Sequence, residues 1–128
     1  MARILPAPIG APLDEQLSEE QRQRHAARIQ ELDVALQEQL DVARAGWGDK
    51  YVQRVHEKGK LTTWERIEAL KDPGSEVRAF GSLVNWGREF AGSRRAAPGA
   101  GVVTAFVQVA GRTTIVIAND NTVASGAW

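Results

Sequence analysis

The chain has 128 residues, 43% hydrophobic and 25% charged, and its 16 basic and 16 acidic side chains give a formal net charge of zero. These are ordinary values for a globular protein, and they provide no overall field that attracts nucleic acid or an anionic membrane. The absence of cysteine excludes disulfides and thiolate metal sites in this segment, and no run reaches the ~20 apolar residues of a membrane span. We therefore expect a cytoplasmic protein without a nucleic-acid partner.

The N-terminal third is predicted to form an arm and a long amphipathic helix. Residues 1–12 contain three prolines and favour an extended arm, and a helix is predicted from Leu13. Ser18 and Gln21 have the spacing of a capping box, and Gly46 suits the C-terminal cap. Five apolar residues at steps of three or four form one stripe along this helix: Ile29, Leu32, Leu36, Leu40 and Ala43. Such a stripe is typical of a helix that packs on its own domain, and the alternative is a partner helix.

Two shorter helices are predicted next. Trp47, Tyr51 and Val55 are spaced by four and indicate a short helical face. Thr62 and Glu65 have the spacing of a second capping box, which starts a helix whose predicted buried face is Trp64, Ile67 and Leu70. Pro73 disfavours helical geometry at Asp72, and Gly74 permits the reversal that follows.

The C-terminal half is predicted to be mainly β-structure. Residues 76–84 indicate a weak strand, with Val77, Phe80 and Val84 as its buried members, and residues 85–100 indicate a long exposed connection. Two apolar runs, 102–109 and 113–118, are joined at Ala110-Gly111, which predicts a β-hairpin with a tight turn.

The second run of this hairpin is apolar at four consecutive positions, 115–118. Successive residues of a strand face opposite sides of the sheet, so this run expects cover on both faces. A two-stranded hairpin alone is only marginally stable in water. Further strands and covering helices are therefore expected, and we interpret the segment as the opening part of a larger α/β domain.

The pattern contains no identifiable reaction centre. His25 and His56 are the only histidines; both lie in polar surroundings and are expected to be solvated, and no metal-ligand spacing is present. Arg94-Arg95 could contact a phosphate, although a solvated loop explains the pair as well. The most suggestive stretch is 119–127, NDNTVASGA, whose small residues leave backbone N–H groups open to close approach by a ligand.

Three blocks of sequence then point to a family. They are residues 56–67, which begin HEKGKLT; residues 70–75, LKDPGS; and residues 101–123, which contain GVVT, VAGR and DNTV. In this order and at this spacing the chain resembles, from about Tyr51 to Trp128, the N-terminal end of biotin-dependent carboxyltransferases. These are the β subunits of acyl-CoA carboxylases and the α subunit of glutaconyl-CoA decarboxylase.

The resemblance implies a crotonase-like spiral of β-β-α units, with 1–45 as an N-terminal arm and helix and 46–128 as the incomplete start of a carboxyltransferase domain. It implies transfer of a carboxyl group between carboxybiotin and an acyl-CoA. The implied partners are the biotin carboxyl carrier, the biotin carboxylase component and, in the full-length protein, further copies of the same subunit. It implies no metal and no catalytic side chain in this segment, because the backbone N–H groups that hold the enolate come from later segments.

One binding site can be carried over by the resemblance. The family often has DFTVxGGS where this chain has DNTVASGA at 120–127, in a loop on the CoA side of the site. The implied contact residues are Ser125, Gly126 and Ala127, with Ser125 in place of the first glycine. Two alternatives remain: a glutaconyl-CoA-type decarboxylase subunit, which runs the same half-reaction in reverse, and a non-enzymatic module that binds a partner through the apolar stripe.

Overall fold

The computed structural model describes residues 10–90 and 95–127. They belong to two compact units, Met1–Leu36 and Gln37–Trp128. The boundary predicted after residue 45 stays a prediction. Within the described ranges, no helix is both long enough and apolar enough to cross a membrane.

The described part of the N-terminal unit is helical. A short helix, α1 (Leu13–Gln16), precedes the 26-residue helix α2 (Glu19–Arg44). The predicted capping box is confirmed, since the Ser18 hydroxyl accepts from the N–H of Gln21 at 3.2 Å and the Gln21 side chain accepts from the N–H of Ser18 at 2.8 Å. Because this capping box starts a new helix, two helices lie where the sequence predicted one continuous helix from Leu13.

The apolar stripe of α2 is not buried. Ile29, Leu32 and Leu36 are exposed and no residue of α2 is buried, so nothing within their own unit covers these three side chains. That the stripe packs on the rest of the domain stays a prediction. Pairs within the helix support α2 instead, such as Arg28 with Glu31 at 2.9 Å. A partner helix for the stripe stays a prediction.

Two short helices follow in the C-terminal unit. Helix α3 (Asp49–His56) carries Tyr51 and buries Val55, as predicted. Trp47 lies in the turn before the helix, where its ring meets that of Tyr51 edge to face at 5.3 Å. Helix α4 (Thr63–Leu70) begins at the predicted capping box of Thr62 and Glu65.

The buried face of α4 is narrower than predicted. Ile67 is 2% exposed and Trp64 is half-buried, but Leu70 is 50% exposed. Leu70 lies in a groove that Val116 and Ala118 also line. These two residues belong to the edge strand of the sheet, so no further strand among the described residues covers Leu70.

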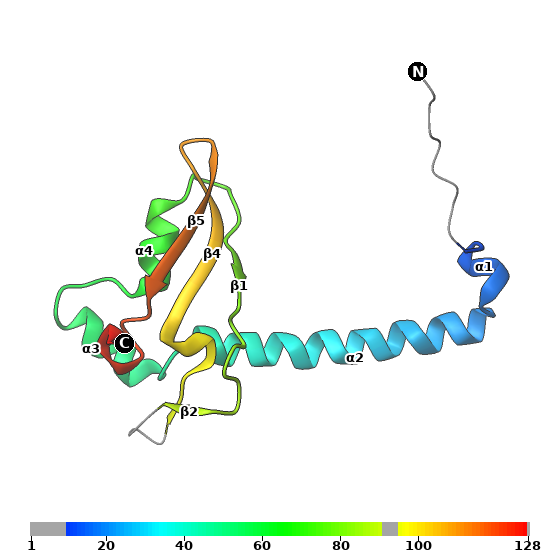
Figure 1. Cartoon of the computed structure of the whole chain (residues 1–128), viewed down its shortest axis with the longest axis horizontal. Helices are drawn as coiled ribbons and strands as arrows, with labels where there is room; N and C mark the ends of the chain where they lie inside the picture. The colour runs from blue at the N-terminus through cyan, green and yellow to red at the C-terminus, as the bar shows by residue number, and fades with distance from the viewer. Residues whose placement is uncertain (1–9, 91–94, 128) are drawn as a thin grey trace. The chain divides into compact units, whose positions relative to one another are not determined.

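The sheet of the C-terminal unit has three antiparallel strands in the order β1-β4-β5 (Figure 1). They are β1 (Arg78–Phe80), β4 (Val102–Val109) and β5 (Arg112–Asn119). The predicted hairpin is confirmed, with Thr104 opposite Ile117 and Phe106 opposite Ile115. Its turn holds Ala110 at φ 51° and Gly111 at φ 72°, the paired positive φ values of a two-residue turn whose twist suits the hairpin.

The two faces of this sheet differ in cover. Helix α4 lies against one face of the hairpin, where Ile67 packs with Val103, Ala105 and Val107 to form the core (Figure 1). On the other face Ile115 and Ile117 are 54% and 70% exposed. Among the described residues, only one face of the sheet is covered, whereas the sequence predicted cover on both faces.

The strand prediction at 76–84 is only partly right. Val77 is half-buried against the core, but Phe80 and Val84 are exposed, contrary to expectation. Phe80 lies on the uncovered face, where its ring stacks on that of Phe106 at 4.9 Å. Val84 follows the strand, in the turn after it.

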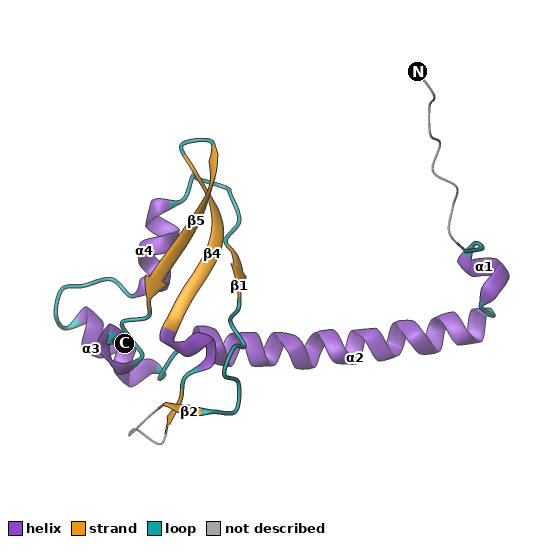
Figure 2. Cartoon of the chain, viewed as in Figure 1, coloured by secondary structure: helices purple, strands orange, loops and turns teal. Residues whose placement is uncertain are grey.

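The predicted exposed connection contains ordered structure (Figure 2). Strands β2 (Glu89–Phe90) and β3 (Arg95–Ala96) pair antiparallel, and a 3₁₀ helix, η1 (Pro98–Gly101), leads into β4. Ala97 is buried, which the prediction of an exposed loop missed. Of the arginine pair, Arg94 lies outside the described residues.

Asp72 joins the end of α4 to the tip of the hairpin. Its two carboxylate oxygens accept from the N–H groups of Ala110 and Gly111, each at 2.7 Å. Its own N–H donates to the carbonyl of Gln108 at 2.8 Å. The chain reverses directly after Asp72, at Pro73-Gly74, where Gly74 has φ 76°. Asp72 thus lies beside the hairpin turn and binds it with both carboxylate oxygens.

Candidate functional site

The loop of residues 119–127 begins at the last residue of β5 and is held by hydrogen bonds among its own residues. Asp120 is buried, and its Oδ1 accepts from the N–H of Thr122 at 2.9 Å and from the Thr122 hydroxyl at 2.7 Å. Thr122 and Val123 are buried as well. The first half of the loop is therefore part of the packed unit, although its sequence resembles that of an ordinary turn.

The second half of the loop is a left-handed turn. Ala124, Ser125 and Gly126 have φ values of 46°, 59° and 76° and form a 3₁₀ turn, η2 (Ala124–Gly126). The N–H of Gly126 donates to the carbonyl of Val123 at 2.8 Å. The Asn119 side chain donates to the carbonyl of Gly126 at 3.1 Å and closes the loop at its far end.

The three predicted CoA-contact residues lie together in this turn. Ser125 and Ala127 are exposed and Gly126 is half-buried, so this stretch is open to a ligand. The left-handed φ of Ser125 also shows why glycine suits this position, since a side chain is strained there and glycine is not. Contact with CoA stays a prediction.

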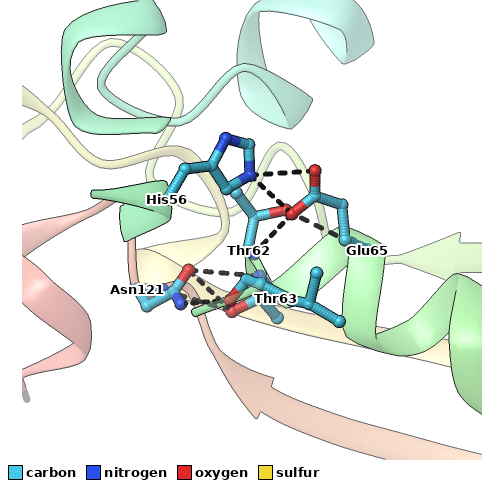
Figure 3. Close-up of polar contacts among 6 residues, drawn as sticks. His56, Thr62, Thr63, Glu65 and Asn121 are labelled. Carbon is cyan, nitrogen blue, oxygen red and sulfur yellow. Dashed lines mark hydrogen bonds and ion pairs between the residues drawn. The ribbon is translucent and has the colours of Figure 1, made fainter. Parts of the chain in front are cut away.

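The start of α4 is bonded to the start of this loop (Figure 3). The Thr63 hydroxyl donates to the carbonyl of Asn119 at 2.7 Å and accepts from the N–H of Asn121 at 3.2 Å. In return, Asn121 Oδ1 accepts from the N–H of Thr63 at 3.1 Å, and Asn121 Nδ2 donates to the carbonyl of Leu61 at 2.9 Å. With a longer contact of 3.4 Å from the Thr63 hydroxyl to Asn121 Oδ1, five hydrogen bonds join residues 56 to 60 positions apart in sequence.

His56 extends this network beyond α4. Its Nε2 lies 3.0 Å and 2.8 Å from the two carboxylate oxygens of Glu65 (Figure 3). Glu65 Oε2 also accepts from the N–H of Thr62 at 2.7 Å, as the capping box requires. His25 is exposed, as expected, but His56 has a specific partner that the sequence analysis missed. The charged residues around His56 gave no sign of a contact nine residues away.

The contacts of Glu65 make its ionisation part of the helix start. The hydrogen bond from His56, followed by the hydrogen bond from the Thr62 backbone, lowers the pKa of Glu65. A carboxyl group whose pKa is lower in the folded state stabilises the fold above its unfolded pKa, about 4.5. That stabilisation is lost as the pH falls through the lower, folded pKa.

We expect Glu65→Gln to flatten this acid dependence. Glutamine still accepts from the N–H of Thr62, so the helix start is kept, but it carries no charge to lose. Urea unfolding between pH 6 and pH 3 should show a steeper loss of stability in the wild type than in the variant. The matched control is Glu57→Gln, an exposed glutamate without an ion pair in the described part of the chain. If Glu57→Gln flattens the profile equally, the contacts of Glu65 are not the cause.

The C-terminal unit contains a cavity of about 340 Å³. It is lined by Trp64 and by charged residues of both signs, namely Asp41, Arg44, Arg78 and Asp120. The Arg44 guanidinium lies 4.6 Å from the ring centroid of Trp64. On charge alone the cavity has no preference for an anion or a cation. Among the described residues no group of His, Asp and Glu side chains could hold a metal ion.

Comparison with known proteins identifies the family. The sequence family described as "Carboxyl transferase domain" matches residues 54–128, more than half of the chain. The chain belongs to the carboxyl transferase domain family. This confirms the resemblance found in the sequence.

Relatives of this carboxyl transferase domain chain include a carboxylase subunit and a decarboxylase subunit. It is 37% identical over 93 residues to the methylcrotonoyl-CoA carboxylase beta chain, mitochondrial, of Dictyostelium discoideum, covering 73% of this chain and 15% of that protein. It is 36% identical over 104 residues to the methylmalonyl-CoA decarboxylase subunit alpha of Veillonella parvula, covering 78% of this chain and 20% of that protein. It therefore spans only 15 to 20% of the length of these relatives.

A solved structure agrees with the sequence relatives. The transcarboxylase 12S structure, described as a hexamer assembly with hydrolysed methylmalonyl-coenzyme A bound, superimposes with a TM-score of 0.62 at 34% identity. The match covers 73% of this carboxyl transferase domain chain and 18% of that chain. The mixed α/β fold expected from the sequence is thus shared with a structure that binds a CoA compound.

Proposed function

We propose that these residues are part of a biotin-dependent acyl-CoA carboxyltransferase subunit. In this proposal the whole subunit moves a carboxyl group between carboxybiotin, carried on a biotin carboxyl carrier, and an acyl-CoA. A biotin carboxylase component and further copies of the same subunit are its other partners. The single observation that carries the proposal is the family match over residues 54–128, which includes all three sequence blocks. A cytoplasmic location stays a prediction.

The segment supplies the N-terminal part of a crotonase-like spiral in this proposal. Its support comes from the exposed side chains of Ile115 and Ile117 and from β5, which lies at the edge of the sheet. An apolar face and an unpaired strand edge favour pairing and packing with further polypeptide. The test is to read the coding sequence past Trp128. We expect carboxyltransferase sequence to follow, and an immediate stop codon would rule the proposal out.

The contribution of this segment to the reaction is binding. We assign no catalytic side chain here, because in this proposal backbone N–H groups, rather than side chains, stabilise the enolate. The proposed contact with CoA is the stretch of Ser125, Gly126 and Ala127, in which Ser125 and Gly126 are left-handed and the carbonyl of Gly126 is held by the Asn119 side chain. The groups that stabilise the enolate are assigned to later segments, so the 128-residue chain alone should be inactive.

We expect the 128-residue chain to bind free CoA only weakly. The turn is one wall of the proposed site, and a partial site provides little of the buried contact that tight binding needs. Calorimetric titration should give no saturation at CoA concentrations up to about 1 mM, equivalent to a binding free energy weaker than about 4 kcal/mol. Tight binding of one CoA per chain would contradict the proposal that the site is shared with later segments.

Two alternatives are separated by experiment. A decarboxylase subunit of the glutaconyl-CoA type runs the same half-reaction in reverse, so the full-length protein should be assayed in both directions with its carrier. A non-enzymatic interaction module is favoured by one observation, the exposed stripe of Ile29, Leu32 and Leu36. That alternative requires a protein that ends at residue 128, so the coding sequence decides it as well.

A further inference from the structure

The contacts around Thr63 give this residue two functions at once. As the first residue of α4, it has a backbone N–H with no partner inside the helix, and Asn121 Oδ1 accepts from that N–H. Its hydroxyl meanwhile binds backbone atoms on both sides of Asp120, the carbonyl of Asn119 and the N–H of Asn121. Thr63 is buried, so these bonds are shielded from competing water.

The loop is therefore fixed at three points. Thr63 and Asn121 hold its beginning, the Asp120 carboxylate holds Thr122 in its middle, and the Asn119 side chain holds Gly126 at its end. Left-handed conformations are unfavourable for residues that carry a side chain, as Ala124 and Ser125 do. Residues persist in such conformations only where the surrounding contacts over-determine them.

We propose that Thr63 and Asn121 are positioning residues, which hold residues 124–126 in the left-handed turn that, with Ala127, acyl-CoA contacts. The inference rests on the proposed function for its ligand, but its structural part does not. Neither residue touches the proposed ligand, and both act through the backbone of the loop. The anchor comes from α4, so the same helix that covers the core also sets the shape of the binding turn.

The structural part is tested by amide hydrogen exchange on the 128-residue chain. The N–H groups of Gly126 and Ala127 both donate within the loop, so their exchange rates report its shape. In Thr63→Val and Asn121→Ala these two amides should exchange roughly tenfold faster relative to the amide of Val107 in the core. A purely global loss of stability would speed loop and core amides together and leave that ratio unchanged.

Two further variants complete this design. Thr63→Ser keeps the hydroxyl and should restore the wild-type ratio. Thr114→Val makes the same change of threonine to valine in strand β5. The Thr114 hydroxyl donates to the carbonyl of Arg112 and to no loop residue among those described, so this variant should leave the ratio unchanged. If Thr63→Val and Asn121→Ala both keep the wild-type ratio, the positioning role is overturned.

The ligand part is tested with free coenzyme A as the probe. Titration followed by ¹H–¹⁵N spectra should shift the amide signals of residues 124–127 in the wild type, and by less than half as much in Thr63→Val. If coenzyme A shifts none of these signals in the wild type while the exchange ratio responds as expected, the turn does not contact coenzyme A in the 128-residue chain and the positioning role stands. If it shifts them equally in both proteins, the turn does not need Thr63 for binding and the inference fails.

Discussion

Replacing Ile67 by alanine should lower the free energy of unfolding by about 3 kcal/mol, as expected for a large-to-small change in a closed core. Ile67 is 2% exposed and packs against Val103, Ala105 and Val107, so it joins α4 to the sheet. The small residues around it leave little that can move to fill the cavity. Urea unfolding followed by tryptophan fluorescence measures the loss.

The matched control for this change is Leu70→Ala on the same helix. Leu70 is 50% exposed beside the edge strand, so the same kind of truncation should cost less than about 1 kcal/mol. If both variants lose equal stability, Leu70 is covered in solution and the sheet has a partner that the described residues do not include.

Replacing Gly46 by alanine should cost about 3 kcal/mol through two separate effects. Gly46 has φ 57°, where a side chain adds on the order of 1 kcal/mol of strain. Its Cβ would lie 2.0 Å from the Thr122 hydroxyl oxygen and 3.2 Å from the Thr122 Cβ, so the buried start of the loop would have to shift. Overpacking of this kind costs typically 1–3 kcal/mol. Urea unfolding gives the total.

Gly59→Ala separates the two effects. Gly59 has φ 66°, and no atom lies within 4 Å of the position that an added Cβ would take. This change therefore introduces backbone strain without a steric clash. We expect a loss of about 1 kcal/mol there. Equal losses in the two variants would mean that Gly46 does not pack against Thr122.

Local features of this fold were predictable from sequence. The capping boxes at Ser18 and Thr62 and the turn at Ala110-Gly111 each depend on residues within four positions of one another. Contacts across the fold were not predictable in the same way. The exposure of Phe80 depends on which face of the sheet is covered, and the strand pattern alone does not say which.

The candidate site shows the same division. The small residues of 119–127 marked the loop as a place for a ligand, and the resemblance selected Ser125, Gly126 and Ala127 within it. The bonds that shape the loop were missed, because Thr63 and Asn121 are 58 residues apart and neither is unusual in its own segment. The left-handed φ of Ala124 was missed because alanine ordinarily avoids it.

The hydrogen bonds between Asp72 and the hairpin tip fix the register of β4 against β5. Both carboxylate oxygens are occupied, one by the N–H of Ala110 and one by that of Gly111. A slip of one residue would pull one amide out of reach and turn every side chain of the shifted strand to the opposite face. A loop tip, ordinarily the first place that a protease nicks, is here held closed by a residue 38 positions earlier in the chain.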